Sequence, residues 1–352
     1  MSAGPLRRVW ITGGAGFIGA AVARALVERG DDVTALVRDR SRAARISDLG
    51  VTLVDDDLSD VRGLTESLRD IDAVIHAAGM YRVGINRAER GAMWDANIGT
   101  TTRVLDAAEA AGVKRIVYVS TVNVFGDTHG EVVDETYRRD LAQGFLSWYD
   151  ETKFGAEEVV AQRIRGGAPV VIVMPSQVYG RGDHSEVGEQ LRLAFEGTLR
   201  YRALDDVGLA MVHVDDLAAG IVAALDRGIA GQRYVLAGPR LRLREAVTLA
   251  AEIGGKRPPA LTLPTRLLRA LRPVGRLAGQ PNLAEVISAS AGVTYWASSD
   301  KATAELGFST RPFEAGLRET LTGRPGGSPS SAAVDTAQAA PSGTQPPSGN
   351  EP

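Results

Sequence analysis

The chain has no cysteine among its 352 residues, which excludes disulfides, thiolate catalysis and Cys-ligated zinc or iron–sulfur sites. Its four histidines are dispersed along the sequence without metal-ligand spacing, so we expect no metal. A formal net charge of −3 provides neither the basic stripe of a nucleic-acid-binding protein nor a polybasic patch for anionic lipid.

Long apolar segments are missing as well. No run approaches the roughly 18 residues that cross a bilayer, and the segment before Val9 lacks the apolar core of a signal peptide. We therefore expect a cytoplasmic protein with no nucleic-acid partner and no membrane insertion.

What is present, up to Pro175, is a regular alternation of short β-branched runs with amphipathic helical stretches. This alternation predicts an α/β fold, a Rossmann-type, doubly wound parallel sheet with helices on both faces. Ligands of such sheets bind beyond the carboxyl ends of the strands. The expected strands are Val9–Thr12, Val33–Val37, Thr52–Asp55, Ala73–His76, Arg115–Ser120 and Val170–Met174.

Glycines gather directly after the first expected strand, where Thr12 to Gly19 read Thr-Gly-Gly-Ala-Gly-Phe-Ile-Gly. Gly14, Gly16 and Gly19 satisfy G-x-G-x-x-G, and Gly13, Gly16 and Gly19 satisfy G-x-x-G-x-x-G. A sharp turn from strand to helix needs glycine for unusual backbone angles and for the close approach of a pyrophosphate. The N–H groups at the start of the helix bind that anion, so the turn predicts a dinucleotide site.

The chain divides into three regions on this basis. Residues 1–175 are expected to form the dinucleotide-binding Rossmann domain. Residues 176–321 are expected to form a smaller mixed α/β substrate-binding lid, with strands that return to the main sheet. From residue 322 the composition collapses to Pro, Gly, Ser, Ala, Thr and Gln, so residues 322–352 are expected to be a disordered tail.

A tyrosine and a lysine lie four residues apart in Tyr149-Asp-Glu-Thr-Lys153, at the start of an expected helix. Residues at this spacing share one helix face, so we expect the Lys153 ammonium near the Tyr149 phenol. A nearby positive charge favours phenolate and lowers the phenol pKa, which would make Tyr149 a proton donor to a carbonyl. Ser120 and Thr121 end the preceding strand, where a hydroxyl either polarises the reacting carbonyl or caps the strand end.

In their order along the chain these motifs resemble the extended short-chain dehydrogenases/reductases, the NAD-dependent epimerase/dehydratase family, from about Val9 to Leu321. The pattern is most similar to that of dihydroflavonol reductases, 3β-hydroxysteroid dehydrogenases and hopanoid-associated reductase-like proteins. Further matching segments are Asp57-Leu58, His76-Ala77-Ala78-Gly79, Asn97-Ile98-Gly99-Thr100 and Pro175 to Gly180.

The resemblance implies a role for each matching residue. Tyr149 would exchange the substrate proton, Thr121 rather than Ser120 would hold the substrate oxygen, and Asn97 would support a proton-relaying water. Lys153 would bind the ribose hydroxyls and lower the phenol pKa. The implied cofactor contacts are Gly13, Gly16, Phe17, Ile18, Gly19, Asp57, Leu58, Ala77, Ala78, Lys153, Pro175 and Val178.

The end of the second strand indicates which dinucleotide is preferred. NAD-preferring relatives place an acidic residue there to bind the ribose hydroxyls. Here Val37 is followed by Arg38, whose guanidinium suits a 2′-phosphate, so we predict a preference for NADP(H). The alternatives are that Asp39 binds the ribose of NAD(H), or that Arg38 is a solvated surface charge.

Two sequence differences narrow the reaction class. Val122-Asn123 stand where sugar-nucleotide dehydratases carry an Asp-Glu pair, which disfavours elimination of water. Leu209-Ala210-Met211 offer no charge for the diphosphate of a sugar nucleotide, where epimerases commonly carry Arg-Asp. We therefore predict an NAD(P)-dependent oxidoreductase that interconverts a carbonyl and a secondary alcohol on a moderately apolar small molecule, as a homodimer. The alternatives are a sugar-nucleotide epimerase with tightly held NAD and a non-enzymatic dinucleotide-sensing protein.

Overall fold

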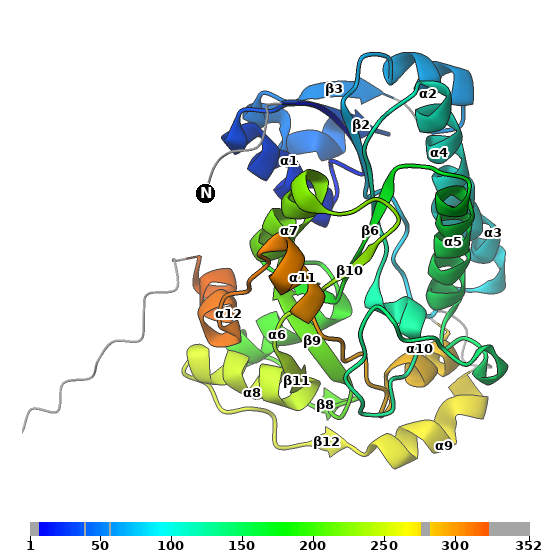
Figure 1. Cartoon of the computed structure of the whole chain (residues 1–352). Helices are drawn as coiled ribbons and strands as arrows, with labels where there is room; N and C mark the ends of the chain where they lie inside the picture. Colours follow the sequence, from blue (N-terminus) through cyan, green and yellow to red (C-terminus); the bar gives the residue numbers. More distant parts are fainter. Residues whose placement is uncertain (1–6, 39, 56–57, 276–281, 324–352) are drawn as a thin grey trace, which may run out of the picture.

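The computed structural model describes residues 7–38, 40–55, 58–275 and 282–323. The predicted disordered tail therefore lies, beyond Gly323, outside the described residues. Between these limits the chain forms a central sheet with helices on both faces and a smaller region of strands and helices built from its second half (Figure 1).

Seven parallel strands form the central sheet, in the order β10-β6-β5-β4-β1-β2-β3. The chain leaves β1 toward β2 and β3, then crosses back to β4 on the other side of β1. A ligand crevice is expected at this reversal, outside the carboxyl ends of β1 and β4. The strands are β1 (Arg8–Thr12), β2 (Asp32–Val37), β3 (Thr52–Asp55), β4 (Ala73–His76), β5 (Ile116–Val119), β6 (Val170–Pro175) and β10 (Arg233–Leu236).

The predicted strands of the first half are confirmed to within about two residues at each end. They form because nearly every side chain in β1, β4, β5 and β6 is apolar and buried, as expected for parallel strands covered on both faces. The prediction of a doubly wound Rossmann-type sheet is therefore correct.

Helices cover both faces of this sheet. One apolar cluster joins a face of the sheet to α1 (Phe17–Arg29), α7 (Val214–Arg227) and α11 (Asp300–Leu306). The other face packs against α2 (Val61–Ser67), α4 (Thr100–Ala110) and α5 (Trp148–Arg165). The short α3 (Arg90–Trp94) leads into α4 through a π-helical segment, Asp95–Gly99.

The second half adds two small sheets, one of order β11-β9-β7 and one of order β12-β8. In Figure 1 these strands lie beyond the carboxyl ends of the central sheet, among the remaining helices. Their bounds are β7 (Gln177–Tyr179), β8 (Arg202–Ala203), β9 (Gly208–His213), β11 (Arg240–Arg242) and β12 (Thr262–Leu263). The helices are α6 (Glu186–Glu196), α8 (Leu243–Ile253), α9 (Thr265–Gly275), α10 (Leu283–Ser290) and α12 (Phe313–Thr322). None of the described helices is both long and apolar enough to cross a membrane.

Candidate active site

A cleft with a volume of about 450 Å³ lies at the carboxyl ends of β1, β4, β5 and β6, where the strand order reverses. It brings together most of the residues that the sequence singled out, from six separate segments. The predicted residues that line it are Gly13, Gly16, Phe17, Ile18, Gly19, Ala77, Ala78, Asn97, Thr121, Tyr149, Lys153, Pro175 and Val178.

One wall of the cleft is the glycine turn between β1 and α1. Gly13 has φ +70°, and a Cβ on Gly19 would lie 2.1 Å from the Gly13 carbonyl oxygen, so neither position accepts a side chain. The N–H of Gly16 donates to that same carbonyl at 2.9 Å, which closes the turn. No side chain caps α1, so the N–H groups of Phe17 and Ile18 at its start have no intrahelical partner, and both residues line the cleft. This arrangement fits a pyrophosphate group.

A buried histidine fixes the opposite wall. His76 ends β4, and its ring nitrogens contact Thr12 Oγ1 at 2.7 Å and Thr101 Oγ1 at 3.0 Å. The Ala78 N–H also donates to Thr12 Oγ1, at 3.0 Å, so the Ala77-Ala78 turn is held against β1. Burial, and secondarily the Lys153 charge, lowers the His76 pKa to about 3, so the ring stays neutral at physiological pH.

Tyr149 lies in the first turn of α5, which begins because the Ser147 side chain accepts from the Asp150 N–H. The Tyr149 ring packs edge-on against Tyr81, with the two ring centroids 4.8 Å apart. Burial, followed by the neighbouring Tyr81, raises the pKa of the Tyr149 phenol. The phenol is therefore protonated at neutral pH, which suits a proton donor.

The predicted contact between Lys153 and Tyr149 is not formed in this structure. The Lys153 ammonium instead donates to Tyr118 Oη at 3.2 Å and to the Val119 carbonyl at 2.9 Å. Both residues line the cleft, but the longer lysine side chain extends to the end of β5, and burial has the largest effect on the phenol pKa. Burial lowers the Lys153 pKa to about 8.

This pKa leads to a pH prediction for cofactor binding. Below about pH 8 the ammonium is charged and would donate strongly to the ribose hydroxyls of a bound dinucleotide, and above it the charge is lost. The Kd for the reduced dinucleotide is therefore expected to rise by about tenfold as pH rises through about 8. Fluorescence titration at several pH values measures this. Lys153→Met should bind weakly at every pH, and a wild-type Kd independent of pH would contradict the assignment.

Ser120 and Thr121, the two hydroxyl residues after β5, have different hydrogen-bond partners. Ser120 Oγ donates to the Glu157 carboxylate, so its proton is already engaged. Thr121 Oγ1 donates to the side-chain oxygen of Asn123 at 3.1 Å, a contact between two residues that both line the cleft.

Asn97 is buried within the π-helical segment, and both the oxygen and the nitrogen of its side-chain amide form hydrogen bonds. The amide accepts from the Met80 N–H at 2.7 Å and donates to the Met80 carbonyl at 3.1 Å and to Thr152 Oγ1 at 2.9 Å. Asn97 thus ties the loop after β4 to α5. A π-helical turn at this point is a feature often found at functional sites.

The segment after β6 completes the cleft. Pro175 ends β6, Val178 lies in β7, and Ser176 between them is buried with a hydroxyl that has no hydrogen-bond partner among the described residues. Because buried polar groups are normally paired, an orphaned hydroxyl in a cleft wall points to a ligand group that pairs with it. The cleft therefore fits a dinucleotide at both the glycine turn and this segment.

Three predicted cofactor residues are not among those that line the cleft. Arg38 is exposed after β2, with no ion pair to a described residue. Leu58 is buried with φ +64°, and its carbonyl accepts from Arg103 at 2.6 Å. Asp57 and the alternative ribose ligand Asp39 lie outside the described residues.

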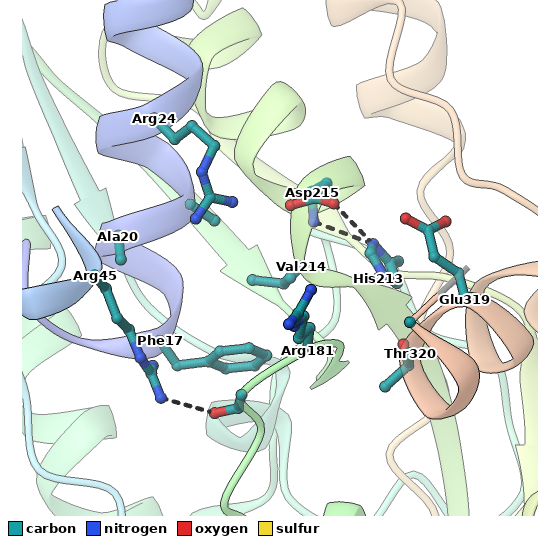
Figure 2. A pocket seen from close by; sticks show the side chains of 13 residues that line it. Phe17, Ala20, Arg24, Arg45, Arg181, His213, Val214, Asp215, Glu319 and Thr320 are labelled. Atoms are coloured by element: carbon teal, nitrogen blue, oxygen red, sulfur yellow. Dashed lines mark hydrogen bonds and ion pairs between the residues drawn. The ribbon is translucent and has the colours of Figure 1, made fainter. Parts of the chain in front are cut away.

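Residues 182–185, from the second half of the chain, also line the cleft, and the sequence did not predict this. Arg45 lies near β2 in sequence, yet its guanidinium donates to the Gly182 carbonyl and contacts His184 Nε2, both at 3.2 Å. Figure 2 shows this contact beside the Phe17 ring, at a second cavity that shares Phe17, Arg45 and Gly182 with the cleft. A contact across 137 residues leaves no local sequence signal.

The second cavity also brings together His213, Asp215 and Glu319, whose potential ligand atoms lie within 4.8 Å of one another. Spacing could not reveal this cluster because Glu319 is remote in the sequence. Its members are tied into the fold: the Asp215 N–H donates to His213 Nδ1, and Arg311 pairs with Glu319 at 2.8 Å.

Comparison with known proteins defines the class of this fold and cleft. Residues 9–237 match the model of the NAD dependent epimerase/dehydratase family. The chain therefore belongs to this family, and it is an enzyme of the extended short-chain dehydrogenase/reductase type.

Several relatives are reductases. A 4-hydroxy-2-methyl-3-oxo-4-farnesyl-3,4-dihydroquinoline-1-oxide ketoreductase of Stigmatella aurantiaca is 32% identical, over 76% of this chain and 79% of the relative. A 2-alkyl-3-oxoalkanoate reductase of Stenotrophomonas maltophilia is 29% identical, over 88% of this chain and 97% of the relative.

Solved structures show the same fold. The crystal structure of gox2253 superposes with a TM-score of 0.80 and 32% identity, over 90% of this chain and 97% of that chain. A dTDP-glucose 4,6-dehydratase, DesIV of Streptomyces venezuelae with NAD bound, gives a TM-score of 0.74 and 26% identity, over 90% and 96% of the two chains.

Proposed function

We propose that this enzyme is an NADP(H)-dependent carbonyl reductase, or alcohol dehydrogenase in reverse, for a moderately apolar small molecule. The observation that carries the proposal is the placement of Thr121 and Tyr149 in one cleft with the glycine turn and Ser176. The ketoreductase of a farnesylated quinoline oxide and the reductase of 2-alkyl-3-oxoalkanoates among the relatives support it.

Each side chain has a role in this reaction. When bound, the dinucleotide supplies hydride from its nicotinamide to the carbonyl carbon. The Tyr149 phenol donates the proton to the carbonyl oxygen, and the Thr121 hydroxyl donates a hydrogen bond to the same oxygen. Lys153 binds the ribose hydroxyls, and Asn97 holds the loop after β4 against α5. Oxidation of the alcohol reverses these proton movements.

Two observations favour a reductase over an epimerase of sugar nucleotides. Leu209, Ala210 and Met211 lie buried in the middle of β9, where no charged side chain is available for a diphosphate. The cleft that holds Thr121 and Tyr149 is also lined by the apolar and aromatic side chains of Met80 and Tyr81. Epimerization of a sugar nucleotide, without net change in the cofactor, remains the second candidate because structural neighbours act on such substrates.

A cofactor-oxidation screen tests the proposal. Purified enzyme is mixed with NADPH and ketones, sterols, flavanonols or sugar nucleotides, and the loss of reduced nicotinamide absorbance is followed. Ketone-dependent loss is the expected result. Conversion of sugar nucleotides alone, without net cofactor oxidation, would establish the epimerase, and dinucleotide binding without any turnover would favour a sensing protein.

The preference for NADP(H) depends on Arg38. Its guanidinium has no described carboxylate partner and is available to a 2′-phosphate, whereas Arg40 is held by Asp55 at 2.6 Å. Arg38→Ala is expected to raise the Kd for NADPH by about tenfold and to leave the Kd for NADH within about twofold. Arg62→Ala, at an exposed arginine of α2, is the matched control. Tighter binding of NADH than NADPH by the wild type would contradict the preference.

We also propose a homodimer that forms through α4 and α5, as family members often do. Light scattering of the purified protein measures its mass, and a monomer at working concentration would exclude the dimer.

A further inference from the structure

A buried carboxylate lies directly behind the proposed catalytic tyrosine. Asp150 follows Tyr149 in α5, is 0% exposed, and its Oδ2 has no hydrogen-bond partner among the described residues. Burying a charged oxygen without a partner costs stability, and the reaction described above makes no use of this carboxylate. A buried, partly unpaired carboxylate next to the cleft is therefore expected to have a role there.

Hydrogen bonds connect Asp150 to Thr121 through one intermediate side chain. Asn123 Nδ2 donates to Asp150 Oδ1 at 3.2 Å, and Asn123 Oδ1 accepts from Thr121 Oγ1 at 3.1 Å. The Asn123 backbone N–H also donates to Thr121 Oγ1, at 3.2 Å, which keeps the two residues together. Thr121 and Asn123 line the cleft, whereas Asp150 does not, so hydrogen bonds connect the carboxylate to the cleft through Asn123, while its charge also raises the pKa of Tyr149 and of Tyr81.

The protonation state of Asp150 decides which group donates and which accepts in each of these hydrogen bonds. An ionised carboxylate only accepts hydrogen bonds, so the Asn123 NH₂ must face it and the amide oxygen must face Thr121. The Thr121 proton then points to Asn123. A protonated Asp150 whose proton is on Oδ1 donates to the amide oxygen instead, and the amide, whose two ends have the same shape, turns over. Its NH₂ group then donates to Thr121 Oγ1, which leaves the Thr121 proton free.

We propose that Asp150 is a positioning residue that sets the direction of the Thr121–Asn123–Asp150 chain. When ionised it draws the Thr121 proton away from the substrate oxygen, and when protonated it releases that proton to the carbonyl. This inference rests on the proposed reductase function, because only a reacting carbonyl needs the donor.

The surroundings allow both states in the working range of pH. Burial raises the Asp150 pKa to about 7, while hydrogen bonds from Ser147 and Asn123 and the charge of Arg139 act in the opposite direction. The nearby Glu285 raises it further. The titratable and charged groups that face Asp150 are Tyr81, Arg139, Tyr149, Glu285 and Tyr295.

The pH profile of kcat for ketone reduction, at saturating NADPH, tests the proposal between about pH 5.5 and about pH 9. Wild-type kcat is expected to fall by about tenfold or more as pH rises through about 7, because a donor to the reacting oxygen is lost. Asp150→Asn can donate to the Asn123 oxygen as a protonated acid does. It should therefore keep the high kcat of low pH across the whole range.

Two further variants separate positioning from a structural role. Asn123→Ala removes the side chain that connects Thr121 to Asp150 by hydrogen bonds, so it should also abolish the inflection in the pH profile. This variant tests the proposal even if Asp150→Asn fails to fold. Glu285→Gln is the matched control, since this carboxylate is also buried beside Asp150 but lies outside the chain. It should retain the inflection and move it to lower pH.

A loss of kcat by Asp150→Asn that is equal at every pH, or an inflection that persists in folded Asn123→Ala, would overturn the proposal; in the second case the Asp150 charge acts directly on Tyr149. Failure of the proposed function is distinguishable, because then the wild type itself reduces none of the ketones.

Discussion

Tyr149→Phe is expected to lower kcat for carbonyl reduction by about 10³-fold while the Kd for NADPH changes by less than about twofold. The substitution removes only the phenol oxygen, and the ring still packs against Tyr81 with its centroid 4.8 Å away. Without the phenol, the cleft loses the buried hydroxyl that hydrogen-bonds with Thr121 and stays protonated near neutral pH. Single-turnover absorbance and fluorescence titration measure the two quantities.

The matched control for this prediction is Tyr295→Phe. Tyr295 is also buried, its hydroxyl donates to the Ala289 carbonyl at 2.9 Å, and it is not among the residues that line the cleft. Its loss should cost about 1 kcal/mol of unfolding free energy and leave kcat within about twofold. Turnover by Tyr149→Phe above about a tenth of the wild-type rate would show that another group supplies the proton.

The second large effect concerns the glycine turn. Gly19→Ala is expected to raise the Kd for NADPH by more than about 100-fold, because its Cβ would lie 2.1 Å from the Gly13 carbonyl oxygen and 3.0 Å from Gly14 Cα. These backbone atoms of Gly13 and Gly14 cannot move away without opening the turn that we propose as the pyrophosphate site. Calorimetric titration with NADPH measures the loss.

Gly91→Ala provides the comparison for that variant. Gly91 lies in α3, and a Cβ there meets nothing within 4 Å, so NADPH affinity should be unchanged and stability equal or slightly higher. The rise in melting temperature that NADPH produces should also survive in Gly91→Ala and disappear in Gly19→Ala. An unchanged Kd in Gly19→Ala would place the pyrophosphate elsewhere.

The sequence predicted most of the central sheet because its signals are local. Apolar runs such as Val170–Met174 mark parallel strands, and glycines mark the turn that follows β1. The same holds for the cleft residues, since the ends of parallel strands meet at one edge of the sheet. Thr121, Tyr149 and Pro175 therefore converge although 54 residues separate the first from the last in the numbering.

What the sequence did not predict depends on contacts between distant segments. Lys153 was expected beside Tyr149 from helix geometry, but a flexible side chain takes the partner that tertiary packing offers, here Tyr118 and the Val119 carbonyl. The contact of Arg45 with the Gly182–His184 segment and the short strands β7 and β11 have no periodic pattern long enough to be recognised. The hydrogen-bond direction at Asn123 is set by Asp150, 27 residues away.

The last strand of the central sheet comes from the second half of the chain. β10 pairs with β6 along Arg233 to Leu236, and α7, which precedes it, packs against α1 beside the glycine turn. A chimera that exchanges everything after Pro175 would therefore remove a sheet edge and the cover of α1 together with the substrate loops. Grafting new specificity onto this enzyme requires shorter replacements, within residues 176–207, several of which line the cleft and all of which precede α7 and β10, so that the scaffold keeps its own seventh strand.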